Sequence, residues 1–273
     1  DRRRRVAAAN PDYYGLLPHE PRNGTFASAD GGATWAQGAA PTYGRFTGVA
    51  DPSLGADAAG HIYYLYMGET PSFCGEGGNV ALLLARSDDG GRTFGPPTVL
   101  DVNPDDDKPF VAVGSTAGYT TVYATFTRLY SGERQILFMR SRDSGHTFSA
   151  PAILYASRGF DFGAVPVAAG TGRVYVIWAH YHASNYYGPL QASIMVRASH
   201  DGGRTFAPAH TIASFTGLPE MLVPGAIRLF TLPVAAVDAR GWLYVAWVRA
   251  RPMARPRFAG EMDADVMLSR SRD

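Results

Sequence analysis

The sequence lacks several features that would identify its class of protein immediately. Its 273 residues contain one cysteine, Cys74, so no internal disulfide can form, and no partner motif marks that thiol as catalytic or metal-binding. No stretch of 18 apolar residues occurs, so no transmembrane helix is expected in this chain. No cofactor motif is present, and the seven histidines show no metal-ligand spacing, so no cofactor is expected. The net charge of +1 argues against a nucleic-acid partner.

Lysine is nearly absent as well, because Lys108 is the only lysine among the 25 basic residues. The chain opens with Asp1 and the four arginines Arg2 to Arg5, and the apolar run of a signal peptide does not follow them. We expect a solvated tail, left by processing or trimming of the N-terminus. Contact with an anionic membrane surface or an acidic partner is the alternative.

One eight-residue phrase occurs four times, and a fifth copy begins at the last three residues. Its pattern is Ser-x-Asp-x-Gly-x-Thr-aromatic, and successive aspartates lie 59, 54, 58 and 72 positions apart. A period of this size predicts an array of similar supersecondary units. The copies are 28–35, 87–94, 141–148, 199–206 and 271–273, with the aspartates Asp30, Asp89, Asp143, Asp201 and Asp273.

Each phrase is expected to form the turn of a β-hairpin. Asp and Ser side chains accept hydrogen bonds from nearby backbone N–H groups, and glycine supplies the positive φ of a tight turn. The Thr hydroxyl can bond the Asp across the turn, and the closing aromatic residue then packs into the apolar layer beside it. Apolar strands precede the phrases at 80–87, 135–141, 192–199 and 265–271.

Two other segments recur between the phrases. One carries proline and small apolar residues, at 51–57, 108–113, 165–169 and 232–238. The next is rich in β-branched and aromatic residues and carries a tyrosine at a matching place: Tyr63, Tyr123, Tyr175 and Tyr244. The sequence therefore predicts an all-β fold, a β-propeller of four-stranded antiparallel blades with the phrase between the third and fourth strands.

The phrase is similar to the Asp-box, also called the bacterial neuraminidase repeat, and the chain resembles the Asp-box β-propeller superfamily that includes the sialidases. The resemblance extends from Thr25 to Asp273. It implies a fold more than an activity, because Asp-boxes are structural and occur in sialidases, other glycoside hydrolases, sorting receptors and photosystem assembly factors.

We expect residues 1–23 to form an N-terminal arm and part of a first blade, and residues 24–273 to form a single sialidase-like propeller. Three units look complete, at about 50–102, 103–157 and 158–216, while the first and last are partial. About five blades are visible, whereas sialidases have six. Either the chain is a fragment of a longer protein, or another segment or subunit closes the ring.

The resemblance also implies what a sialidase site would contain. Three arginines would hold the substrate carboxylate, and a tyrosine nucleophile would work with a glutamate and an aspartic acid/base. The Arg-Ile-Pro motif of the first arginine is absent, and Arg45 is its nearest match. An ordinary surface role is the alternative for every catalytic candidate: Arg45, Arg158, Arg228, Asp51 and Tyr186.

The starts of inner strands share one rim of a propeller channel, so we predict a binding rim there. Its members are Asp51, Asp107, Lys108, Asp161 and Arg228. No metal site is predicted, although Asp105, Asp106 and Asp107 form an oxygen-rich run that could suit Ca²⁺. Their spacing is not that of an EF-hand, and a solvated acidic turn is the alternative.

Two functions remain open. The first is a non-catalytic scaffold outside the cytoplasm (periplasmic, secreted or at the cell surface), acting as a binding or assembly module whose partner is a protein subunit or a glycan. Intact repeats beside a missing Arg-Ile-Pro motif favour it. The second is a sialidase-like exo-glycoside hydrolase whose first blade is missing from this chain. Three arginines converging beside a Tyr–Glu pair would favour the enzyme.

Overall fold

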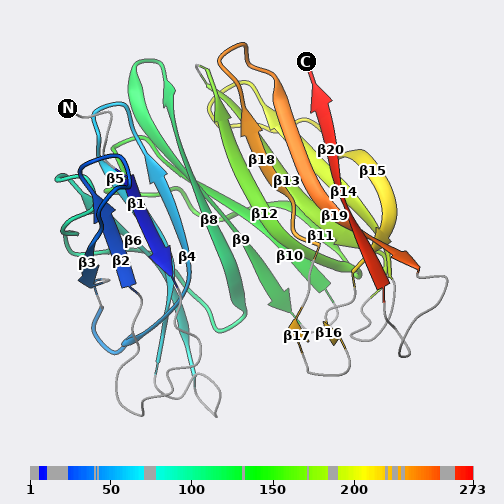
Figure 1. Ribbon diagram of the computed structural model, residues 1–273, viewed down its shortest axis with the longest axis horizontal. Helices are drawn as coiled ribbons and strands as arrows, with labels where there is room; N and C mark the ends of the chain where they lie inside the picture. The colour runs from blue at the N-terminus through cyan, green and yellow to red at the C-terminus, as the bar shows by residue number, and fades with distance from the viewer. Residues whose placement is uncertain are drawn as a thin grey trace.

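The computed structural model describes residues 6–10, 24–39, 41, 43–70, 78–130, 133–170, 172–183, 190–218, 221–222, 227–228, 231–252 and 262–272. Every regular element in these ranges is a β-strand, and the strands form five antiparallel sheets and one short hairpin (Figure 1). The predicted all-β propeller of about five blades is confirmed.

Three blades have four strands in simple sequential order. Blade two contains β4 (Gly48–Ala56), β5 (Ile62–Glu69), β6 (Val80–Ser87) and β7 (Thr98–Val102). Blade three contains β8 (Asp106–Thr116), β9 (Tyr119–Tyr130), β10 (Glu133–Ser141) and β11 (Ala152–Ser157). Blade four contains β12 (Phe160–Ala169), β13 (Arg173–Tyr181), β14 (Leu190–Ser199) and β15 (His210–Gly217). In all three, the phrase lies between the third and fourth strands, as predicted.

The two outer blades have three described strands each. Blade one contains β1 (Val6–Asn10), β2 (Gly24–Ser28) and β3 (Ala36–Ala39), and blade five contains β18 (Val234–Val237), β19 (Leu243–Pro252) and β20 (Met262–Ser271). A hairpin of β16 (Met221–Leu222) and β17 (Ile227–Arg228) precedes blade five. Consecutive blades contact each other in chain order, and Figure 1 shows blade one in blue and blade five in orange to red at opposite sides of the view.

The turns formed by the four complete phrases each contain the same pattern of hydrogen bonds. In the third phrase, the Ser141 hydroxyl donates to Asp143 Oδ1 at 2.7 Å, and the Thr147 N–H and hydroxyl donate to the two Asp143 oxygens at 2.9 and 2.6 Å. The Gly145 N–H donates to Ser141 Oγ at 2.8 Å. The same contacts recur around the other three complete phrases. These are the contacts that the residue types of the phrase predict.

Acid should weaken the phrase turns. Burial raises the pKa of Asp143, but hydrogen bonds from Ser141 and Thr147 outweigh it and lower that pKa to about 2. Because this value lies below the ordinary 3.8, the stabilisation is present above about pH 4 and is lost as the pH falls towards 2. We therefore expect the midpoint of urea denaturation to fall between pH 4 and pH 2. The Asp143→Asn variant should start from a lower midpoint at pH 7 and fall less; an equal fall would contradict the assignment.

The hydrophobic core lies between blades, because the faces of blades two, three and four that carry Tyr63, Tyr123 and Tyr175 each pack on the next blade. Blade two contributes Tyr63, Leu65 and Leu84, which pack against Val122, Ala124 and Phe126 of blade three. The interface of blades three and four is built from Tyr123, Phe138, Val174, Val176 and Trp178. The interface of blades four and five is built from Tyr175, Ile177, Leu243, Val245 and Trp247.

Candidate functional site

Each inner strand of the three complete blades begins with a β-bulge at the same level. The pairing shifts between Ala50 and Ser53 in β4, between Asp107 and Phe110 in β8, and between Phe162 and Val165 in β12. The bulge residues have positive φ: 47° at Asp51, 48° at Lys108 and 66° at Gly163. This left-handed backbone is uncommon for residues other than glycine and is often held in place near functional sites.

The side chains at these bulges meet. Lys108 Nζ donates to Asp51 Oδ2 at 2.6 Å, lies 3.9 Å from Asp107 Oδ1 and sits 6.0 Å from the ring centre of Phe162. Three blades therefore converge on one ammonium group. The carboxylates stay reachable, since the side chains of Asp51 and Asp107 are 10% and 23% exposed.

A third carboxylate, Glu69, belongs to the same cluster. It ends β5, opposite Gly48 of β4. Burial raises its pKa, and the negative charges of Asp51 and Asp107 raise it further, while Lys108 opposes them. We name Asp51, Glu69, Asp107 and Lys108 the bulge cluster.

The acidic groups of the bulge cluster lie in different environments. Burial raises the pKa of Asp107 to about 6, and the neighbouring Asp51 adds to this rise against the attraction of Lys108. Asp51 makes the short ion pair with Lys108, at 2.6 Å. The cluster thus places a carboxyl group in an ion pair with an ammonium beside an acid whose raised pKa lets it keep its proton at mildly acidic pH. Such a difference between neighbouring carboxyl groups is what acid/base catalysis requires.

Sequence analysis missed Glu69, although a signal for it exists. When the second strands are aligned on their tyrosines, its position holds Leu129, Tyr181 and Ala250 in the other blades. A carboxylate where the repeat otherwise carries an apolar side chain marks a departure from the structural pattern. Such departures in a repeat protein are candidates for function.

Asp161 begins an inner strand, as predicted, but does not join the bulge cluster. In the strand register, Asp161 lies opposite His180 of the next strand, and Asp106 lies opposite Arg128 at the same level of blade three. Asp161 therefore occupies the position of Asp106 and not that of Asp107. Successive side chains of a strand point to opposite faces. Asp161 is fully buried, and it accepts from Trp178 Nε1 at 3.0 Å, contacts His180 Nδ1 at 2.9 Å and bonds the Ser157 hydroxyl.

The acidic run at 105–107 is divided between separate environments. Asp106 is buried and accepts from Arg128 Nε at 2.6 Å, whereas Asp107 faces Lys108 and Asp51. The Asp105 carbonyl accepts from the Leu129 N–H at 2.8 Å. Within the described ranges, no group of three His, Cys, Asp or Glu side chains is placed to hold a metal ion.

The other catalytic candidates lie apart or outside the described residues. Arg45 is exposed in a turn, with its guanidinium 5.3 Å from the ring centre of Phe46. Arg158 is exposed between β11 and β12. The backbone of Arg228 forms part of β17, and Tyr186 falls outside the described residues, as do Arg2 to Arg5, Cys74 and Asp273.

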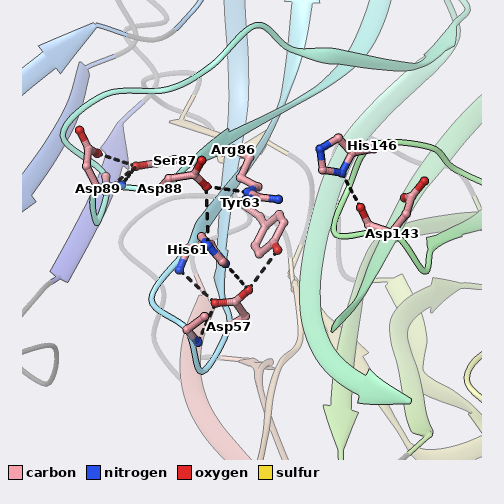
Figure 2. Close-up of polar contacts among 11 residues, drawn as sticks. Asp57, His61, Tyr63, Arg86, Ser87, Asp88, Asp89, Asp143 and His146 are labelled. Atoms are coloured by element: carbon pink, nitrogen blue, oxygen red, sulfur yellow. Dashed lines mark hydrogen bonds and ion pairs between the residues drawn. The ribbon is translucent and has the colours of Figure 1, made fainter. Parts of the chain in front are cut away.

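A second polar cluster lies at the opposite end of β4 and is structural (Figure 2). Asp57 accepts from the His61 N–H at 3.0 Å and the Tyr63 hydroxyl at 3.1 Å, and it lies 2.7 Å from His61 Nδ1. His61 in turn approaches Asp88 of the adjacent phrase at 3.7 Å. Blade five repeats this arrangement around Asp238, where the N–H of Trp242 and the hydroxyl of Tyr244 donate to the carboxylate. Its contacts hold the turn between β4 and β5 against the adjacent phrase turn at 87–94.

Comparison with protein-family models and with curated proteins found no match. Similar solved structures include the α-L-arabinanase of Penicillium chrysogenum, with 14% identity, a TM-score of 0.61 and coverage of 88% of this chain and 71% of that one. The α-L-arabinofuranosidase of Fusarium graminearum has 12% identity and a TM-score of 0.57, covering 82% and 63%. The NanB sialidase of Streptococcus pneumoniae has 12% identity and a TM-score of 0.57, covering 97% and 57%.

The chain therefore spans less than two thirds of the arabinofuranosidase and of the sialidase. The likeness shows a β-propeller fold, which these glycoside hydrolases share. Identities this low show the fold alone. No helix among the described residues is long and apolar enough to cross a membrane.

Proposed function

We propose that this chain is the propeller of a glycoside hydrolase and that the bulge cluster is its catalytic site. The observation that carries the proposal is the convergence of Asp51 and Asp107 on Lys108, at bulges that hold Asp51 and Lys108 in left-handed backbone. Glu69 is near enough for the charges of all three to shift its pKa. Pairs of carboxyl groups with different pKa values are the usual machinery of glycoside hydrolysis.

In this proposal Asp107 is the proton donor and Asp51 is the nucleophile or base. Asp107, whose pKa is raised to about 6, gives its proton to the leaving oxygen as the glycosidic bond breaks. Asp51, which forms an ion pair with Lys108, faces the positive charge that develops on the sugar ring. One Nζ lies 2.6 Å from an Asp51 oxygen and 3.9 Å from an Asp107 oxygen, so the carboxyl groups are close together.

The substrate proposed is an uncharged glycoside. The acidic groups of the bulge cluster outnumber its one ammonium, which opposes a sugar that carries its own carboxylate. The arginine candidates Arg45 and Arg158 are exposed and form no part of the bulge cluster, so they do not offset that charge. The proposal thus departs from a sialidase in substrate while it keeps the sialidase-like fold.

We also infer that the four complete phrases are Asp-boxes, because their Ser, Asp, Gly and Thr residues make the bonds that the pattern requires. An extracytoplasmic location belongs to the same proposal, since polymeric glycans are met outside the cytoplasm. Fractionation of cells with an antibody against the chain would test the location, and a cytoplasmic pool alone would contradict it.

The activity is tested with 4-methylumbelliferyl glycosides. We expect hydrolysis of a neutral substrate, with α-L-arabinofuranoside and common neutral hexopyranosides in the panel, and no hydrolysis of the sialoside. Release of fluorophore from the sialoside alone would overturn the proposed substrate class. If no substrate of the panel is cleaved or bound by the folded chain, the enzyme proposal fails.

A non-catalytic binding module is the second candidate, and one observation favours it. Val266 and Leu268 of β20 are 79% and 66% exposed, whereas Leu82 and Leu84, which hold the same places in blade two, are 1% and 2% exposed. An apolar face of this kind suits a protein partner. A chain that binds a partner through this face and cleaves no glycoside would establish that role instead.

A further inference from the structure

A line of polar side chains crosses the four strands of blade four. Asp161 of β12 lies opposite His180 of β13 in the strand register. His180 in turn lies opposite Ser193 of β14, which lies opposite Ser214 of β15. We name these four residues the polar row. It lies next to the bulge of β12 and has no part in the hydrolysis proposed for the bulge cluster.

The polar row distinguishes blade four from the other two complete blades. In blade two, the same register positions are apolar or glycine: Val49, Gly68, Ala81 and Val102. In blade three, they hold an acid and an arginine that form an ion pair, followed by Gln135 and Ala156. Only blade four places a histidine there, with a serine on each of the next two strands. A departure of this kind from a structural repeat is a candidate for function.

A second histidine, His182, lies beside the polar row. Its N–H donates to the Gln191 carbonyl at 3.0 Å, so the strand pairing continues past Tyr181. Residues two apart on a strand share a face. The rings of His180 and His182 are in contact, with their centres 4.8 Å apart and their planes at 76°. The His180 side chain is 13% exposed and His182 is exposed, so solvent reaches both rings.

His180 is oriented by a buried carboxylate. Its Nδ1 lies 2.9 Å from Asp161 Oδ1, and the Asp161 side chain is fully buried. Trp178 Nε1 donates to the same carboxylate at 3.0 Å, and the Ser157 hydroxyl donates to its other oxygen. Because a carboxylate only accepts, Nδ1 carries the proton of the neutral imidazole and Nε2 presents a lone pair. Metal-binding histidines are commonly oriented by a carboxylate in this way.

His182 is oriented through its other ring nitrogen. Its Nε2 lies 3.2 Å from Ser193 Oγ, which lies 3.0 Å from Ser214 Oγ. When Nε2–H donates to Ser193, the Ser193 hydroxyl can donate to Ser214, and Nδ1 of His182 presents a lone pair. Among the residues that the structure describes, no hydrogen bond involves Nε2 of His180 or Nδ1 of His182.

We propose that His180 and His182 bind one divalent transition-metal ion of the kind that favours imidazole, such as Zn²⁺, through Nε2 of His180 and Nδ1 of His182. A ring nitrogen binds Zn²⁺ at about 2.0–2.1 Å, which places the ion about 3.2 Å from each ring centre. Rings whose centres lie 4.8 Å apart then subtend an angle of roughly 100° at the ion, between the angles of octahedral and tetrahedral coordination. Within the described ranges no third such ligand joins them, so water completes the coordination.

Titration calorimetry of the full, metal-free chain with ZnCl₂ at pH 7.5 tests the proposal. We expect one Zn²⁺ per chain and no binding of Mg²⁺, which prefers oxygen ligands. His182→Ala should lose Zn²⁺ binding and keep its fold, because His182 is exposed. His200→Ala is the matched control, since it removes an exposed histidine from a phrase turn and should bind Zn²⁺ like the native chain. If the native chain binds no Zn²⁺, or if His182→Ala binds it equally well, the proposal is overturned.

A second measurement identifies the ligands. Cu²⁺, which also favours imidazole, should show electron paramagnetic resonance couplings to two imidazoles in the native chain and to one in His180→Ala and in His182→Ala. Asp161→Asn should weaken Zn²⁺ binding by about 10- to 100-fold, because Asp161 orients His180 without touching the ion. Couplings that are the same in the native chain and both histidine variants would place the ion elsewhere and overturn the proposal. All these readouts measure metal binding, so they are independent of the proposed hydrolysis.

Discussion

The Asp107→Asn variant is expected to lose about 10²- to 10⁴-fold in kcat/KM for 4-nitrophenyl glycosides while it keeps its fold. The amide cannot give a proton to the leaving oxygen, so the step that depends on general acid catalysis is the one that slows. The loss should be much smaller with a 2,4-dinitrophenyl glycoside, whose leaving group departs without protonation. This contrast distinguishes a proton donor from a residue that only shapes the site.

The pH profile gives a second measure of the same role. A general acid must be protonated to act, and the pKa of Asp107 is raised to about 6. The kcat/KM of the native chain should therefore fall as the pH rises above about 6, and that fall should be absent in Asp107→Asn. Asp105→Asn is the matched control, because it makes the same chemical change two positions away and should leave rate and profile unchanged. If Asp107→Asn and Asp105→Asn behave alike, Asp107 is not the proton donor.

The Gly203→Ala variant is expected to lose about 2–4 kcal/mol of the free energy of unfolding. The residue has φ of 75°, which disfavours any side chain. In addition, the new Cβ would lie 2.5 and 2.8 Å from two atoms of the Phe138 ring, which is 2% exposed and packed against Phe206. Because the ring has little room to move, the interface of blades three and four must open. Urea denaturation at pH 7 measures the loss.

Gly32→Ala is the matched control for the steric part of that loss. Gly32 holds the same place in the first phrase and has φ of 93°, but the nearest atom to its Cβ is a Trp35 ring carbon at 3.7 Å. This variant should lose only the conformational part, about 1–2 kcal/mol. Equal losses for the two variants would show that contact between blades adds nothing at this position.

Only part of the candidate site could be predicted from the sequence. Asp51, Asp107, Lys108 and Asp161 were expected on one rim, because all four stand at the starts of inner strands. The structure brings the first three together and turns Asp161 away, since its register is one residue different from that of Asp107. A shift of one residue moves a side chain to the opposite face of its strand. A bulge inserts such a shift, and its position is not evident from the sequence.

The sequence by itself determined the phrase turns and the order of strands in each blade. The hydrogen bonds that the Ser, Asp, Gly and Thr residues of a phrase make with one another, such as those joining Ser141, Asp143 and Thr147, lie within eight residues, so residue identity and spacing suffice to specify them. Only the tertiary structure decided which side chains meet between blades: Lys108 with Asp51 across 57 positions, and Phe138 with Phe206 across the next interface. Those meetings depend on where each strand bulges and on how the blades pack, which are properties of the assembled sheets and of no single segment.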